Sequence, residues 1–268
     1  MSDDNDDTPT AQSIRERLLE AHRTGNLIKA VETCRNDDIA EEDVARELAA
    51  LHNNGTVDIV ETFSELRKSE AGLFFFDVLA VFGHALPIIA HDLLPVIRCV
   101  RQLVQEAGQD QAARTTISYF ITFLEKAPNR LKQALISIKA EPELHGLLPA
   151  TLVAGCKSDM LTYIEEALLL TKTKNEDMRR QAVLALGQIK WSEENRPSEA
   201  VYVALEEILS TDASDGMLAT TARTAASLLK HDPSQADRLI NLVNSALEKG
   251  GEIAVHTAAV ETRSGLTV

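Results

Sequence analysis

The stretch of sequence that decides the fold reads Asp177-Met178-Arg179-Arg180-Gln181-Ala182-Val183-Leu184-Ala185-Leu186-Gly187-Gln188-Ile189. Its small and apolar residues stand at i, i+4, i+7, i+8 and i+11, a spacing that places one broad apolar stripe along a helix. They are Met178, Ala182, Ala185, Leu186 and Ile189. The same spacing returns 40 positions later, again with a small or apolar residue at every position: Leu218, Ala222, Ala225, Ala226 and Leu229.

A second, shorter stretch is also repeated. Residues 164–168 (Ile-Glu-Glu-Ala-Leu) recur as residues 205–209 (Leu-Glu-Glu-Ile-Leu), 41 positions further on. Self-similarity at a period of about 20 to 50 residues is typical of stacked repeat proteins. A single helix pair cannot bury the apolar faces of both helices, so neighbouring pairs must stack along a shared core. The sequence therefore predicts an all-α protein, an α-solenoid of about seven antiparallel helix pairs.

Glycine, proline and asparagine separate the expected helices, since these residues end helices or begin turns. No stretch shows the period-2 alternation of a strand bounded by turn residues. The expected pairs are 9–24 with 26–35, 41–54 with 56–66, 73–89 with 92–108, 110–127 with 129–140, 146–157 with 159–172, 176–190 with 198–210, and 216–230 with 235–248.

An eighth first helix begins near Glu252, but the repeat pattern decays there. Thr262 and Arg263 stand at positions that should be apolar. Two interpretations stay open: an atypical capping helix, or a repeat in a chain that continues in a longer protein. We expect a disordered acidic tail at 1–8, a single repeat domain over 9–263 with its strongest repeat match over 144–250, and a frayed end at 264–268.

Residues 177–189 resemble the first helix of a HEAT or HEAT-like repeat, whose pattern is an acid, then arginine, then A-x-x-A-L-G-x-I. The resemblance is best over residues 176–230, and it implies an armadillo-type α-solenoid with a right-handed superhelix. In that family the acid and the arginine commonly bond across adjacent repeats, and Asp177 and Arg180 match them. Thr220 and Thr221 stand near the next arginine position, so we expect an incomplete polar ladder.

Charge and cysteine content narrow the class of protein. The formal net charge of −14 argues against a nucleic-acid partner, because binding phosphates needs a basic surface. Neither a signal peptide nor an uninterrupted apolar stretch of membrane-spanning length is found. The three cysteines lack CxxC spacing, which favours reduced thiols: Cys34, Cys99 and Cys156. We therefore expect a cytoplasmic protein without a membrane segment.

The search for catalytic motifs gives no candidate. The phosphate-binding Gly-rich loop, HExxH and G-x-S-x-G are all absent. His84, His91 and Asp92 flank the break at Pro87 and raise a metal hypothesis, but ordinary capping and loop roles are favoured over it. The aromatic run at 74–76 either fills helix interfaces or leaves one ring exposed for docking, and filling is favoured. We predict no catalytic residue, no cofactor and no metal.

One repeated acidic pair suggests a binding surface. Glu165 and Glu166 recur as Glu206 and Glu207 at the same phase of two second helices, so stacking should align four carboxylates, with Tyr202 on the same helix. The family resemblance implies that second helices line the concave face. We hypothesise that these residues bind a basic peptide or protein segment; the alternative is a solvated helix face.

The leading functional hypothesis is a non-enzymatic scaffold or adaptor that binds a protein or peptide. The resemblance leaves two enzymatic alternatives, a HEAT-like DNA glycosylase for alkylated bases and a chromophore lyase. A glycosylase needs a basic groove with aromatic residues, which a charge of −14 and a single tryptophan, Trp191, fit poorly. A third possibility is an arm of a larger chain.

Overall fold

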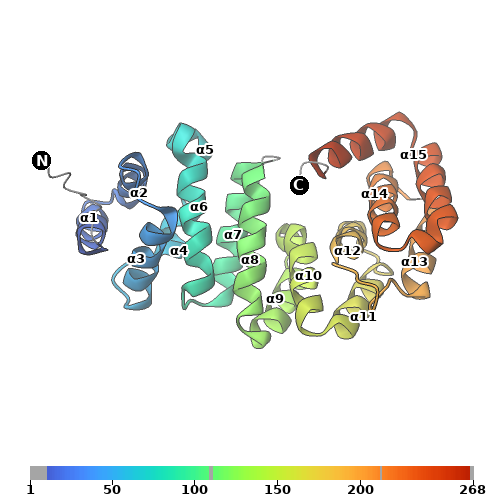
Figure 1. The fold of residues 1–268 in the computed structure, drawn as a ribbon, viewed down its shortest axis with the longest axis horizontal. Helices are drawn as coiled ribbons and strands as arrows, with labels where there is room; N and C mark the ends of the chain where they lie inside the picture. Colours follow the sequence, from blue (N-terminus) through green and yellow to red (C-terminus); the bar gives the residue numbers. More distant parts are fainter. Residues whose placement is uncertain (1–10, 109–110, 212, 266–268) are drawn as a thin grey trace, which may run out of the picture. The chain divides into compact units, whose positions relative to one another are not determined.

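The computed structural model describes residues 11–108, 111–211 and 213–265, and every regular element in these ranges is a helix (Figure 1). The prediction of an all-α fold is confirmed. The chain divides into two compact units, residues 1–137 and 138–268, which we call unit 1 and unit 2. The tail predicted at 1–8 lies outside the described residues, as do residues 266–268 of the predicted frayed end.

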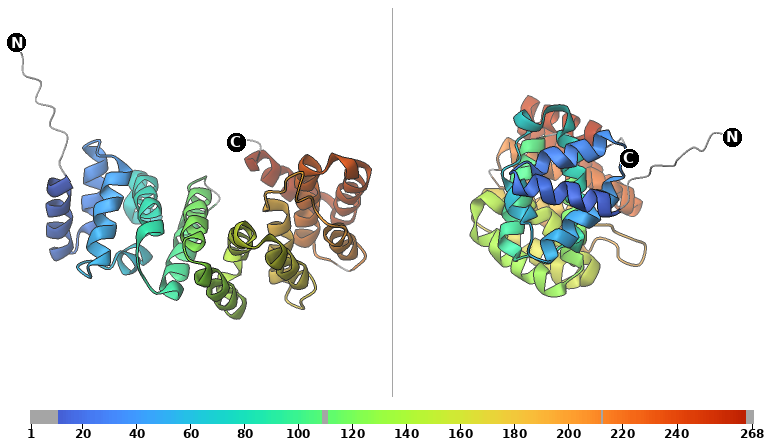
Figure 2. Two further views of the ribbon diagram at one scale, coloured as in Figure 1. Left: turned by 60° about the horizontal axis from the view of Figure 1, so that its bottom comes forward. Right: turned by 90° about the vertical axis from the view of Figure 1, so that its left-hand side faces the viewer.

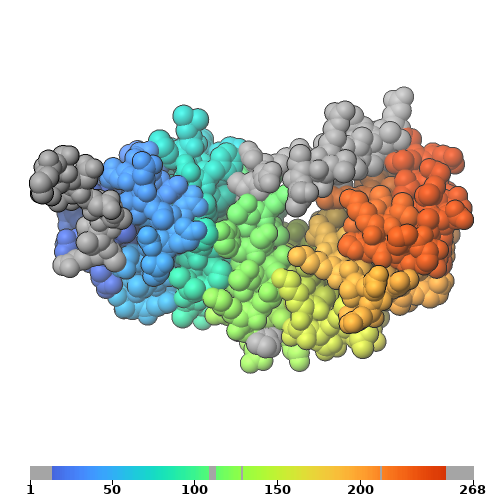
Figure 3. Space-filling view, viewed as in Figure 1, coloured from blue at the N-terminus to red at the C-terminus, as the bar shows by residue number. Residues whose placement is uncertain are grey.

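Unit 1 is built from helices that alternate between two layers. Along the chain they are α1 (Ala11–Arg23), α2 (Leu27–Asn36), α3 (Glu41–Asn53), α4 (Ile59–Ser64), α5 (Lys68–Ala71), η1 (Gly72–Phe74), α6 (Phe75–Ala85), η2 (Leu86–Ile88), α7 (Leu93–Ala107), α8 (Gln111–Glu125) and the first part of α9 (Pro128–Ala140). In one layer α3 packs on α6 and α6 on α8, while α4 packs on α7 in the other. In Figure 3 the side chains fill the gaps between these neighbouring helices.

Backbone breaks separate the elements of unit 1. Gly72 and Gly108 adopt positive φ angles of 56° and 67°, a region that favours glycine, and they end α5 and α7. Pro87 lies in η2, where the predicted helix over 73–89 ends. The helix predicted over 56–66 is shorter than expected, because α4 ends at Ser64 and the short α5 follows.

Aromatic side chains fill the core of unit 1. The rings of Phe63 and Phe82 stack with their centroids 4.8 Å apart. In the run at 74–76, Phe75 is buried, whereas Phe74 and Phe76 are half-buried. Leu73, directly before the run, is 92% exposed.

One stretch of the described residues, Lys68–Ile88, is long and apolar enough to cross a membrane by length and composition, with a mean hydropathy of 1.8. We expected no uninterrupted apolar stretch of this length, since the most apolar run, residues 73–89, is interrupted at Pro87. Half of the stretch is buried inside unit 1, where Phe75 and Phe82 belong to the core. Core packing therefore accounts for this apolar sequence within the described fold.

Unit 2 repeats one arrangement of paired helices. After α9 come η3 (Pro142–Leu147), α10 (Leu148–Ser158), α11 (Met160–Leu170), α12 (Glu176–Gln188), α13 (Glu199–Leu209), α14 (Asp215–His231), η4 (Pro233–Gln235) and α15 (Ala236–Gly265). The first helices α10, α12 and α14 pack in series, and so do the second helices α11, α13 and α15 (Figure 2). The expected eighth first helix is the continuation of α15 beyond Gly251, where the backbone breaks at φ 60°.

The repeated small residues bring the first helices of unit 2 into close contact. Every position of the stripe in α12, with the neighbouring Ile189, is buried. A Cβ placed on Gly187 would lie 3.0 Å from the Cα of Thr224 in α14. The Thr224 hydroxyl donates a hydrogen bond of 2.9 Å to the carbonyl oxygen of Val183, and the Ser227 hydroxyl donates one of 2.6 Å to that of Gly187.

The polar link between repeats differs from the one that the resemblance implies. Arg180 donates a hydrogen bond of 2.9 Å to Asp177 within its own helix. Across the repeat boundary, Asp177 instead lies 3.3 Å from Nδ1 of the buried His145 in η3. In the next boundary, the Ser214 hydroxyl donates to the carboxylate of Glu176. These two boundaries therefore have different polar pairs, His145 with Asp177 and Ser214 with Glu176.

The buried face of α11 is rotated from the expected one. The sequence pattern placed Leu161, Ile164 and Leu168 inside, but Leu161 is 76% exposed. The buried residues are instead Tyr163, Ala167 and Leu170. The cause is the ring of Tyr163, which packs directly on Gly155 of α10, where a Cβ would lie only 2.1 Å from Cδ1 of the ring.

This contact gives a paired prediction for two helical glycines. Gly155→Ala should lower the free energy of unfolding by about 1–3 kcal/mol, because the added methyl group forces the buried Tyr163 ring to move. Gly216→Ala should raise it by about 0.5–1 kcal/mol, because alanine is the better helix former and the nearest atom to its Cβ is 3.9 Å away. Urea unfolding of both variants measures the difference. Equal effects would show that the Gly155–Tyr163 contact does not limit packing.

Candidate functional site

The predicted acidic residues lie on α11 and α13, and three of the four pair with the protein's own cations. Lys139 donates a hydrogen bond of 2.6 Å to Glu166. Arg238 donates one of 2.6 Å to Glu206, and Lys172 lies 3.6 Å from Glu207. Glu165 is exposed. The internal pairs reduce the negative charge that this surface offers to a ligand.

Tyr202, predicted beside these carboxylates, is a core residue. Its side chain is buried, its hydroxyl donates a hydrogen bond of 2.6 Å to Asp232, and the guanidinium of Arg238 lies 5.1 Å from its ring centroid. Burial and the bond to Asp232 raise the pKa of Tyr202. The same Arg238 donates two bonds of 2.9 Å to Glu199. This cluster ties α13 to the start of α15.

The two histidines behind the metal hypothesis contact different carboxylates in the structure. His84 lies 2.7 Å from the hydroxyl of Tyr119 and 3.6 Å from carboxylate oxygens of Glu41 and Glu42. His91 contacts a different carboxylate, that of Asp58, 3.4 Å away. Within the described ranges, no group of three or more His, Cys, Asp or Glu side chains is arranged to hold a metal ion.

A concave, negatively charged surface lies instead in unit 1. A cavity of about 500 Å³ opens among the end of α1, α2, α4 and α5, and we call it the acidic pocket. Apolar side chains contribute to its wall, namely Leu27, Ile28, Leu66 and Ala71. The ionisable residues that line it are His22, Lys29, Glu32, Asp58, Glu61, Glu65 and Glu70. Five carboxylates therefore face one lysine.

Helix geometry gathers part of this charge. Asp58 caps α4 by accepting the N–H groups of Val60 and Glu61 at 2.9 and 3.0 Å. Asp58, Glu61 and Glu65 follow at i, i+3 and i+7, so they share one side of α4. Sequence analysis could have found this spacing. Glu32 and Glu70 come from α2 and α5, and only the fold brings them to the same pocket.

The carboxylates of the acidic pocket differ in whether they form ion pairs and hydrogen bonds. Glu61, Glu65 and Glu70 are exposed, and within the described part of the chain their side chains form no ion pair or hydrogen bond. Glu32 is only 8% exposed at its side chain and accepts a hydrogen bond of 2.7 Å from the ammonium group of Lys29. The pocket thus accommodates one ammonium group and has carboxylates left for others.

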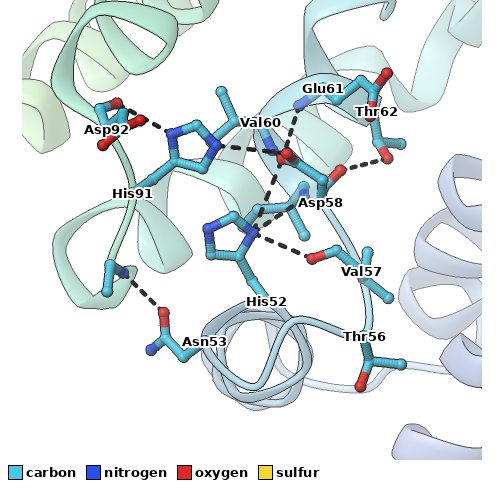
Figure 4. A network of polar contacts seen from close by, with 12 residues as sticks. His52, Asn53, Thr56, Val57, Asp58, Val60, Glu61, Thr62, His91 and Asp92 are labelled. Atoms are coloured by element: carbon cyan, nitrogen blue, oxygen red, sulfur yellow. Dashed lines mark hydrogen bonds and ion pairs between the residues drawn. The ribbon is translucent and has the colours of Figure 1, made fainter.

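Two histidines lie behind Asp58 (Figure 4). His52 of α3 and His91, just before α7, stack with ring centroids 5.2 Å apart. Nδ1 of His52 lies 3.3 Å from the backbone nitrogen of Ile59 and 3.2 Å from the carbonyl oxygen of Val57. Nε2 of His91 points at Asp58, and Nδ1 lies 3.0 Å from the carbonyl oxygen of Asp92.

The neighbouring Asn53 anchors the segment that carries His91. Its side chain donates a hydrogen bond of 3.0 Å to the carbonyl oxygen of Ile88 and accepts one of 2.7 Å from the N–H of Ala90. The end of α3 thereby fixes the connection from η2 to α7. The histidine stack is consequently held by backbone contacts on both sides.

The surroundings shift two pKa values in this network. Burial lowers the pKa of His52, and the nearby carboxylate of Asp58 opposes this only in part. Burial alone would raise the pKa of Asp58, but the N–H of Glu61 and the contact with His91 outweigh it and lower that pKa. His52 therefore favours the neutral form and Asp58 the charged form.

The lowered pKa of His52 predicts a loss of stability on mild acidification. Unfolded His52 takes up its proton at a higher pH than folded His52, so acidification below about pH 6.5 favours unfolding. The slope contributed by one such group is at most about 1.4 kcal/mol per pH unit. Urea unfolding at pH 7.5 and 5.5 should show a smaller loss for His52→Gln than for the original chain.

The exposed His22 provides the control for this measurement, since His22→Gln should leave the loss unchanged. The lowered pKa of Asp58 affects stability in a lower pH range, because the stabilisation by the charged carboxylate is lost only below about pH 4. An unchanged pH response in His52→Gln would contradict the assignment.

Comparison with known proteins gives no relative from which a function could be transferred. No protein-family model, no curated protein and no solved structure matches this chain. The acidic pocket and the second-helix carboxylates are therefore interpreted from their own geometry and charge.

Proposed function

We propose that this chain is a non-enzymatic interaction module built from HEAT-like helical repeats, which binds a positively charged segment of a partner protein in the cytoplasm. Two features support the repeat part of the proposal. First helices and second helices of unit 2 pack in separate series, and the small residues of α12 recur in α14. Stacked helix pairs expose extended surfaces, which suit the binding of partner segments.

The observation that carries the binding proposal is the acidic pocket. Three exposed carboxylates, those of Glu61, Glu65 and Glu70, line a cavity of about 500 Å³ in which the ammonium group of Lys29 is paired with Glu32. Lysine and arginine side chains would supply the missing charge through hydrogen-bonded ion pairs. The apolar wall at Leu27 and Leu66 suits the aliphatic stems of the same side chains.

The second-helix carboxylates provide another surface for the same kind of partner. Glu165 lies between the exposed Leu161 and Leu169 on α11. Glu166, Glu206 and Glu207 would have to exchange an internal cation for a ligand cation, which adds little free energy. We therefore assign the main contact to the acidic pocket and use the carboxylates of the second helices as the comparison in the test.

A binding experiment with two charge-reversed variants tests this assignment. The probe is a fluorescent peptide of eight residues with alternating lysine and alanine, and a peptide with glutamine for lysine is the neutral control. Glu61→Lys/Glu65→Lys/Glu70→Lys should weaken binding of the basic peptide by about tenfold or more, since three ion pairs become repulsive. Glu165→Lys/Glu206→Lys/Glu207→Lys makes the same change in net charge and should weaken it by less than about threefold.

The measurement is fluorescence anisotropy at low and moderate salt, with circular dichroism to confirm that both variants stay helical. Added salt should weaken binding to the original chain, because exposed ion pairs are screened. Equal losses in the two variants would indicate a net-charge effect, and the acidic pocket would not be the site. Equal binding of the neutral peptide would contradict the proposal for a basic partner.

A further inference from the structure

Asp58 connects the acidic pocket to the histidine stack. One carboxylate oxygen, Oδ1, accepts two N–H groups at the start of α4, and the other, Oδ2, faces Nε2 of His91 at 3.4 Å. The same side chain lines the pocket. A change in the charge of His91 therefore changes the electrostatic surroundings of a carboxylate that lines the acidic pocket.

Both ring nitrogens of His91 face groups that can only accept a hydrogen bond. Nδ1 lies 3.0 Å from the carbonyl oxygen of Asp92, and Nε2 lies 3.4 Å from Oδ2 of Asp58. The neutral ring carries one hydrogen and can donate to only one of these two groups. The protonated ring can donate to both, and its hydrogen bond to Asp58 is then charge-assisted.

His52 limits the stack to one positive charge. Its side chain is only 4% exposed, and its Nδ1 lies within hydrogen-bonding distance of the N–H of Ile59 in the first turn of α4. Charging it would bring two imidazolium rings together with centroids 5.2 Å apart. The side chain of His91 is 18% exposed and is the more accessible of the two.

We propose that protonation of His91 neutralises the negative charge of Asp58 and thereby weakens the binding of a basic segment to the acidic pocket as the pH falls. This inference rests on the proposed function of the pocket. Histidine is the side chain that ordinarily changes charge between about pH 5 and 8. The other titratable groups around the network are Glu61 on α4, Asp92 before α7, Cys99 on α7, Lys29 and Glu32 on α2, and His22 at the end of α1.

The lysine–alanine peptide also tests this inference. Its dissociation constant for the original chain should rise about two- to fivefold between pH 7.5 and 5.5, the size expected when one partly exposed ion pair is lost. His91→Gln should reduce that rise to less than about half, because glutamine does not titrate. His22→Gln removes the other histidine of the pocket and should retain most of the rise. A full rise in His91→Gln, or its loss in His22→Gln, would overturn the inference.

A measurement without peptide separates this inference from the proposed function. Carbon NMR of the carboxyl groups should show Asp58 responding to a titration between about pH 5 and 8 that is absent in His91→Gln. If the peptide fails to bind but this response is seen, the proposed function is wrong and the coupling of His91 to Asp58 stands. If Asp58 shows no response in this range, the inference is wrong whatever the peptide does.

Discussion

The close approach of neighbouring first helices is the constraint on which unit 2 depends. The backbones of α12 and α14 come so near at Gly187 and Thr224 that a single methyl group would be crowded. Only small residues permit this distance, and hydroxyl groups at the interface satisfy carbonyl oxygens of the facing helix. This contact accounts for the recurrence of small residues after 40 positions in the sequence.

Unit 1 differs from unit 2 in its core and in the lengths of its helices. Phenylalanine rings stack in its core, as Phe63 and Phe82 do, while the contact of Tyr119 with Gly83 is of the same kind as that of Tyr163 with Gly155 in unit 2. Its helices also vary in length, since α4 has 6 residues and α5 has 4. Such short helices cover little of the neighbouring α2, so a cavity opens beside them and polar residues of their first turns line it.

Local signals explain which parts of the fold could be predicted. The stripe in α12, the proline break at Pro87 and the glycine stop at Gly108 each act within one helix, and the structure has them where the sequence placed them. The prediction of the buried face of α11 was wrong because the ring of Tyr163 packs against Gly155 of α10. The sequence also did not show that the predicted acidic residues are paired, because the cation that binds Glu206 is Arg238, 32 residues away. The carboxylates of the acidic pocket come from three segments of the fold, and only the spacing along α4 is visible in the sequence.

The two layers of unit 2 differ in how freely their residues can be exchanged. A first helix such as α12 approaches the backbone of α14 closely at Gly187, so this position accepts only a very small residue, while larger apolar residues such as Leu186 fill the rest of its buried face. The outward positions of α11 and α13 contact water or a flexible cation, and a change there leaves the interior untouched. Homologous chains should therefore diverge fastest on the second helices, where new recognition properties can evolve while the architecture is inherited unchanged.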